Sequence, residues 1–163
     1  MSRIAMLVAL ATLAFILDQG TKWLIVEWVM QPPRVIEVTD FFNLVLGHNT
    51  GVSFGMFGSA LAERQDALIG LKLAIVAALS LLALRGESAL ERAGFAVVAG
   101  GALGNILDRL RLSGVTDFLD FHWNGWHWPA FNLADVAITA GVGLVLLSSF
   151  RRPPDAPRAD GLA

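Results

Sequence analysis

The stretch from Gly100 to Asp135 sets polar residues directly against apolar segments, and this feature constrains the fold most. The stretch joins a glycine-rich apolar segment to a short aromatic segment and then to a second apolar segment. Its polar residues are Asn105, Asp108, Arg109, Asp117, Asp120, Asn132 and Asp135. A carboxylate next to hydrocarbon is costly, so such groups indicate a functional site by default. We hypothesise that Asp117 and Asp135 form a catalytic pair at a membrane surface.

Composition supports a membrane domain. Of 163 residues, 55% are hydrophobic and only 16% are charged, whereas about a quarter is charged in soluble domains. The net charge of -2 gives no reason to expect nucleic acid as a partner. The chain has no cysteine, which excludes disulfides, thiol catalysis and thiolate metal sites. We expect one integral-membrane domain at residues 1–152, followed by a disordered tail at 153–163.

Four apolar segments predict four transmembrane helices. They run from Ile4 to about Val26, Ala67 to Leu84, Ala93 to Arg109, and Phe131 to Phe150. The first could instead be a secretory signal peptide, but no small-x-small cleavage site follows it, and it is long enough to cross a bilayer core. The third contains Gly100-x-x-x-Gly104, a spacing that lets helices pack closely in lipid.

Residues 35–57 predict a small sheet on the membrane surface. The segment from Val35 to Leu46 is rich in β-branched and aromatic residues, a turn at Asn49 to Gly51 follows, and then Val52 to Phe57. Residues between the third and fourth helices are interpreted as an extramembrane loop. The fold class is therefore an all-α membrane protein with four transmembrane helices and a small β-structure.

Four spans place both termini on one side of the membrane. Arginine and lysine are almost evenly divided between the two sides, and only the pair Arg151 and Arg152 favours cytoplasmic termini. This topology brings the polar ends of three helices, with the surface segment and the loop, to one depth. Such convergence favours a single site.

Spacing within the helices supports that convergence. Asp18 and Lys22 are four residues apart, which suits an ion pair, and we interpret this pair as structural. If Asn132 caps the fourth helix, Asp135 falls near its positive dipole end; if the helix starts at Pro129, that effect weakens. Two neighbouring carboxylates share one proton, so one can activate water while the other protonates a leaving amine.

The chain contains five sequence blocks, in the same order, that resemble those of the lipoprotein signal peptidases, also called signal peptidase II. This family consists of membrane aspartyl peptidases with four transmembrane helices. The blocks are Asp18–Lys22, Asn49–Phe54, Gly101–Arg109, Val115–Phe118 and Pro129–Asp135. The resemblance implies that Asp117 and Asp135 are the catalytic dyad. It further implies supporting roles for Asp18, Lys22, Asn49, Gly51, Asn105, Arg109 and Asn132.

The resemblance also implies a substrate and a location. The substrate would be a diacylglyceryl-modified prolipoprotein, cut just before its lipid-bearing cysteine. The enzyme would lie in the bacterial inner membrane, with a small periplasmic β-cradle, the active site toward the periplasm and cytoplasmic termini. We expect a monomer that contacts membrane lipids and needs no cofactor.

Other interpretations remain beside this one. Asp120 is three residues from Asp117, and we interpret it as a surface or supporting residue. It becomes the next candidate for the catalytic acid only if Asp117 or Asp135 proves dispensable. Lys72 would extend to the outer interface or pair with an acid there, and Trp123, Trp126 and Trp128 fit an interfacial aromatic belt. His122 and His127 are five residues apart and the sequence has no H-E-x-x-H pattern, which argues against a zinc site. A proton-coupled transporter and a non-catalytic lipid-binding scaffold are the competing function classes.

Overall fold

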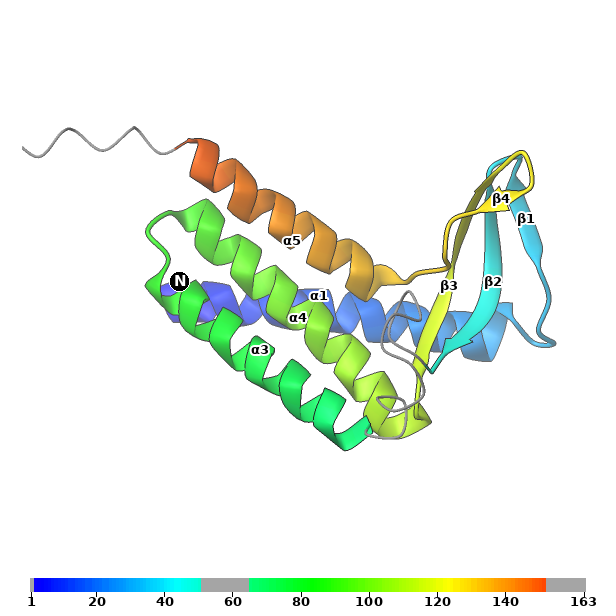
Figure 1. The fold of residues 1–163 in the computed structure, drawn as a ribbon, viewed down its shortest axis with the longest axis horizontal. Helices are drawn as coiled ribbons and strands as arrows, with labels where there is room; N and C mark the ends of the chain where they lie inside the picture. Colours follow the sequence, from blue (N-terminus) through cyan, green and yellow to red (C-terminus); the bar gives the residue numbers. More distant parts are fainter. Residues whose placement is uncertain (1, 51–64, 152–163) are drawn as a thin grey trace, which may run out of the picture.

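Long helices form a bundle that carries a small antiparallel sheet at one end (Figure 1). The computed structural model describes residues 2–50 and 65–151. The helices are α1 (Arg3–Leu24), continued by the π-helix η1 (Ile25–Val29), α3 (Gln65–Arg85), α4 (Ala89–Leu112) and α5 (Leu133–Phe150). The start of α1 and the end of α5 both lie at the end of the bundle away from the sheet.

The predicted helices all form, with shifted ends. The largest shift is at the start of α4, which was expected at Ala93 and lies at Ala89. The cause is an N-cap, because the Ser88 hydroxyl accepts a hydrogen bond from the Glu91 backbone N–H at 3.0 Å. The turn between α3 and α4 therefore shrinks to Gly86–Ser88.

The sheet contains β1 (Ile36–Thr39), β2 (Phe42–Asn49), β3 (Val115–Trp123) and β4 (Trp126–His127), in that order. The prediction of a sheet within residues 35–57 is confirmed for β1 and β2, while Val52–Phe57 lies outside the described residues. The prediction of a loop after the third helix is wrong, because its aromatic and β-branched residues form β3, which pairs with β2 along its length.

Helix α4 is the centre of the bundle and contacts α1, α3 and α5. Gly100 allows α4 to pack closely against α1, because a Cβ at this position would overlap the backbone of Ala11 in α1. Gly104, one turn on, leaves room for the Asp18 carboxylate. The predicted packing role of this glycine pair is confirmed, and it brings polar groups of α1 against α4.

Two of the described helical segments are long and apolar enough to cross a bilayer by themselves. These are Arg3–Val29 and Leu133–Phe150, whose mean hydropathies are 1.8 and 1.9. Many of their large apolar side chains face outward, such as Ile4, Leu13 and Leu146, which are exposed by 62%, 53% and 54%. An apolar exterior of this kind suits a lipid environment.

Replacing Gly100 with alanine is expected to destabilise the bundle. The new methyl group meets the Ala11 backbone, which cannot move without shifting α1, so we expect a loss of about 1 to 3 kcal/mol. The matched control is Gly143→Ala in α5, where a Cβ meets no atom within 4 Å. Thermal unfolding in detergent compares the two variants; equal unfolding temperatures for Gly100→Ala and wild type would contradict the packing.

Candidate active site

Asp117 lies near the start of β3 and is buried, with 5% of its surface exposed. Each of its carboxylate oxygens accepts a hydrogen bond from a side-chain amide. Asn49, the last residue of β2, donates to Oδ2 at 3.1 Å, and Asn132 donates to Oδ1 at 2.6 Å. The carboxylate is therefore held from two sides by groups that stabilise its ionised form.

Asp135 lies in the first turn of α5 and takes part in its capping box. The Asn132 side chain accepts from the Asp135 backbone N–H at 3.1 Å, and Asp135 Oδ2 accepts from the Asn132 backbone N–H at 3.2 Å. The other oxygen, Oδ1, accepts from the Asn105 side-chain amide at 3.0 Å. Of the two helix starts considered from sequence, the cap at Asn132 is confirmed and the start at Pro129 is wrong.

Asn132 joins the two acids. Its backbone N–H donates to Asp135, while its fully buried side-chain amide donates to Asp117. The same amide group lies 3.2 Å from the Asn105 Oδ1 atom and 3.2 Å from the Thr116 carbonyl oxygen. One asparagine thus fixes both carboxylates relative to each other.

A buried ion cluster lies behind these asparagines. The Lys22 ammonium is 2.9 Å from Asp18, 2.9 Å from Asp108 and 3.0 Å from the Asn105 side-chain oxygen. The predicted Asp18–Lys22 ion pair is confirmed. Asp18 also accepts from the Ala134 backbone N–H at 2.9 Å, which connects α1 to the start of α5.

Two residues of this cluster were missed as site residues from sequence. Asp108 was noted among the polar residues of the Gly100–Asp135 stretch but was given no role in the site. It is 4% exposed, and it accepts from the Thr116 backbone N–H at 3.1 Å, next to Asp117. Gln19 donates to Asp18 at 3.1 Å and to Asp108 at 2.9 Å. Gln19 lies within the block Asp18–Lys22 and Asp108 within the block Gly101–Arg109. Their positions in these blocks could have indicated that both belong to the site.

Both acids face one cavity of about 440 Å³. Asn49, Asn105 and Arg109 line it with them, and Arg109 lies within electrostatic range of both carboxylates. Ile75 of α3, Ala102 of α4 and Ile138 of α5 supply apolar wall. Among the residues assigned to the site from sequence, Gly51 lies outside the described residues.

Burial raises the pKa of Asp117 above the usual value for an aspartate. The hydrogen bonds from Asn49 and Asn132 act in the opposite direction, and the nearby Asp135 charge raises the pKa further. The net direction is upward, so Asp117 retains a proton to higher pH than an exposed aspartate.

Asp120 belongs to a different cluster. Residues three apart in a strand point to opposite faces, so Asp120 faces away from Asp117. It contacts His127 at 2.9 Å and accepts from Asn43 at 3.1 Å. Burial opposes ionisation, but these hydrogen bonds outweigh it and lower the pKa of Asp120. Its surroundings therefore favour a structural carboxylate.

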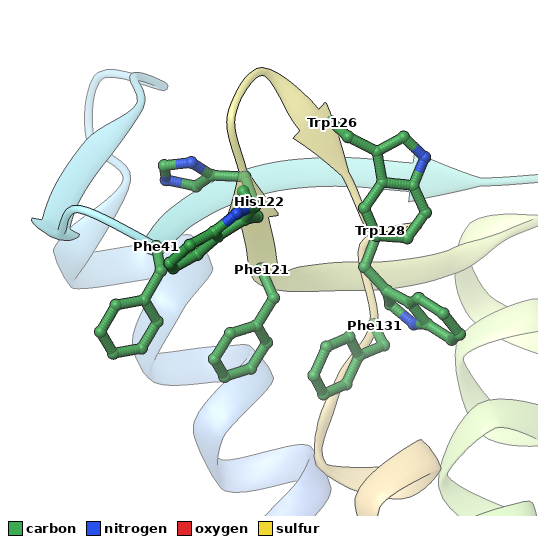
Figure 2. A pocket seen from close by; sticks show the side chains of 7 residues that line it. Phe41, Phe121, His122, Trp126, Trp128 and Phe131 are labelled. Carbon is green, nitrogen blue, oxygen red and sulfur yellow. The ribbon is translucent and has the colours of Figure 1, made fainter.

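A second, aromatic cavity of about 520 Å³ lies on the sheet. Figure 2 shows the phenyl rings of Phe41, Phe121 and Phe131 in a row, with Trp128 beyond Phe131. Trp128 and Phe131 line the aspartate cavity as well, so the two hollows share a wall. The aromatic surface thus adjoins the cavity that holds the two acids.

Within residues 2–50 and 65–151, no group of three or more histidine, aspartate or glutamate side chains is arranged to hold a metal ion. His122 and His127 stack on each other, with ring centroids 5.0 Å apart.

Solved structures with a similar fold are membrane enzymes. One bacterial membrane enzyme, determined by the in meso method, is 25% identical and superimposes with a TM-score of 0.76, covering 94% of this chain and 95% of the other. Another, determined in the same way, is 26% identical with a TM-score of 0.77, covering 92% and 96%.

Curated relatives are similar over most of their length. The lipoprotein signal peptidase of Nitratidesulfovibrio vulgaris is 42% identical over 147 residues, 88% of each chain. That of Syntrophotalea carbinolica is 39% identical over 152 residues, 93% of this chain and 94% of the relative. A model of the signal peptidase (SPase) II family matches residues 10–151. The chain therefore belongs to the signal peptidase II family of aspartic peptidases.

Proposed function

We propose that this protein removes the signal peptide from diacylglyceryl-modified prolipoproteins by cutting just before the lipid-bearing cysteine, with Asp117 and Asp135 as the catalytic dyad. The observation that carries the proposal is the hydrogen-bond bridge through Asn132, which holds two aspartates on the wall of one cavity. The names of the curated relatives support the substrate class.

The two acids divide the work of hydrolysis. One carboxylate accepts a proton as water attacks the scissile carbonyl carbon, and the other, protonated, donates a proton toward the departing amine. The carbon–nitrogen bond breaks, leaving a carboxyl group on the signal peptide and an amine on the cysteine. The raised pKa of Asp117 supports Asp117 as the protonated member of the pair.

The other polar residues support this chemistry. Asn49 and Asn105 each donate to one of the acids, and Arg109 lies within electrostatic range of both, where it can stabilise the charge that develops on the carbonyl oxygen. Gly51 is the remaining residue to which the family resemblance assigns a supporting role. Asp18 and Lys22 act from behind by holding Asn105 and the start of α5.

We infer that α1, α3, α4 and α5 all cross the bacterial inner membrane, with the sheet on the periplasmic side and both termini in the cytoplasm. A helix of about 20 residues spans a bilayer core of about 30 Å, and the shortest of these helices has 18 residues. The apolar lining of the cavity comes from β3 and from α3, α4 and α5, which suits a signal peptide and acyl chains lying in lipid. Residues 1–152 would form one peptidase domain, active as a monomer.

Replacing either dyad member with asparagine is expected to abolish cleavage. Asp117→Asn and Asp135→Asn keep the side-chain shape but remove the carboxylate, so we expect a fall of about a thousandfold or more in kcat. The matched control is Asp120→Asn, which changes the same strand on its opposite face. The substrate is a diacylglyceryl-modified lipobox peptide, and unfolding temperature in detergent verifies folding.

The outcomes separate the competing ideas. Full activity in a folded Asp117→Asn or Asp135→Asn variant would refute the dyad, and loss only in Asp120→Asn would transfer the role to that residue. Absence of cleavage by wild type would favour a transporter or a scaffold.

Removing the Asn49 amide is expected to shift the pH profile of kcat/KM to higher pH. Its hydrogen bond favours ionised Asp117, so Asn49→Ala raises the pKa of Asp117 further. Because Asp117 acts while protonated, the alkaline limb of kcat/KM should shift by about one pH unit to higher pH. The control, Asn43→Ala, removes an equivalent bond to Asp120 and should leave the limb in place. A limb that stays fixed or moves to lower pH in Asn49→Ala would count against this assignment.

A further inference from the structure

Lys72 is an unexplained cation in the active-site cavity. It is the only charged residue between Ala67 and Leu84 in the sequence of α3, and it lies partly buried on the cavity wall that also holds Asp117 and Asp135. A lysine within a membrane helix is costly, so its presence in a cavity indicates a function.

The surroundings of Lys72 leave its ammonium available to a ligand. In the part of the chain that the structure describes, no hydrogen bond or ion pair joins Lys72 to another side chain. Its charge is repelled by the charge of Arg109 and attracted by that of Asp135. Arg109, by contrast, lies within range of three carboxylates: Asp117, Asp135 and Asp108.

The charge balance of the site depends on Lys72. The carboxylates of the site are Asp18, Asp108, Asp117 and Asp135, and the cations of the site are Lys22, Lys72 and Arg109. With one proton shared by the dyad, these seven groups are neutral together. Without Lys72 they carry one net negative charge, which would repel any anion formed in the cavity.

Hydrolysis of an amide forms such an anion. Water adds its oxygen to the carbonyl carbon, the carbon–nitrogen bond breaks, and the amine leaves with a proton. At neutral pH the new carboxyl group of the signal peptide ionises within the cavity that Asp117, Asp135 and Lys72 line. We propose that Lys72 binds the new C-terminal carboxylate of the released signal peptide; this inference rests on the proposed function.

Direct binding tests the proposal without relying on turnover. A fluorescent signal peptide that ends at the residue before the cysteine is prepared with a free C-terminal carboxylate and, separately, with a carboxamide. Fluorescence anisotropy in neutral detergent gives Kd values for wild type, Lys72→Gln and Lys72→Arg. The matched control is Arg85→Gln, which removes a cation from the exposed far end of the same helix.

Wild type should bind the carboxylate about tenfold more tightly than the carboxamide, as a charge-assisted hydrogen bond implies. That preference should fall below about twofold in Lys72→Gln, and persist in Lys72→Arg and Arg85→Gln. An unchanged preference in folded Lys72→Gln, or no preference in wild type, would overturn the proposal.

Two further measurements distinguish a failure of the proposed function from a failure of the Lys72 proposal. Cleavage of the lipobox peptide is assayed on the same preparations, so a carboxylate preference without cleavage refutes the proposed function and leaves the anion site standing. Binding to phosphatidylglycerol nanodiscs is compared for wild type and Lys72→Gln. If Lys72→Gln weakens only that binding, the anion is a lipid phosphate and the proposal is wrong.

Discussion

The rest of the site depends on the burial of the Lys22 ammonium between two carboxylates. Lys22 is 4% exposed, and its partners Asp18 and Asp108 come from α1 and α4. An ion buried this deeply is tolerated only when its partners compensate for the water it loses. The close approach of α1 and α4 at Gly100 and Gly104 brings these partners together. Helix packing and charge pairing therefore depend on each other.

The ammonium also determines the orientation of the amides that reach the dyad. Lys22 has only hydrogens to donate, so Asn105 must turn its oxygen toward Lys22 and its NH₂ group toward Asp135. Asn132 donates to the same Asn105 oxygen and to Asp117. Asp108 holds the backbone of Thr116, the residue before Asp117. Lys22 thus fixes the orientation of the Asn105 amide, and through Asn105 and Asn132 it positions both acids.

Local patterns in the sequence were sufficient for the helices and the Asp18–Lys22 pair, because each depends on residues close together in the chain. They left two starts open for the fourth helix, and the structure selects the cap at Asn132. Strand β3 was predicted as a loop, since its structure comes from pairing with β2, about 70 residues away. The same pairing determines which face each carboxylate occupies, so Asp117 and Asp120 could not be separated by sequence spacing alone. Asp108 and Gln19 were missed because their partners lie on other helices.

The central claim is that Lys22 holds the dyad in its working geometry. Lys22→Met tests this most directly, by kcat for cleavage of a lipobox peptide and by the free energy of unfolding. The account predicts a loss of about 3 to 5 kcal/mol in unfolding free energy, because two buried carboxylates lose their cation. It also predicts a fall in kcat for the fraction that remains folded, because Asn105 loses its fixed orientation. Wild-type stability together with wild-type kcat in Lys22→Met would contradict the account.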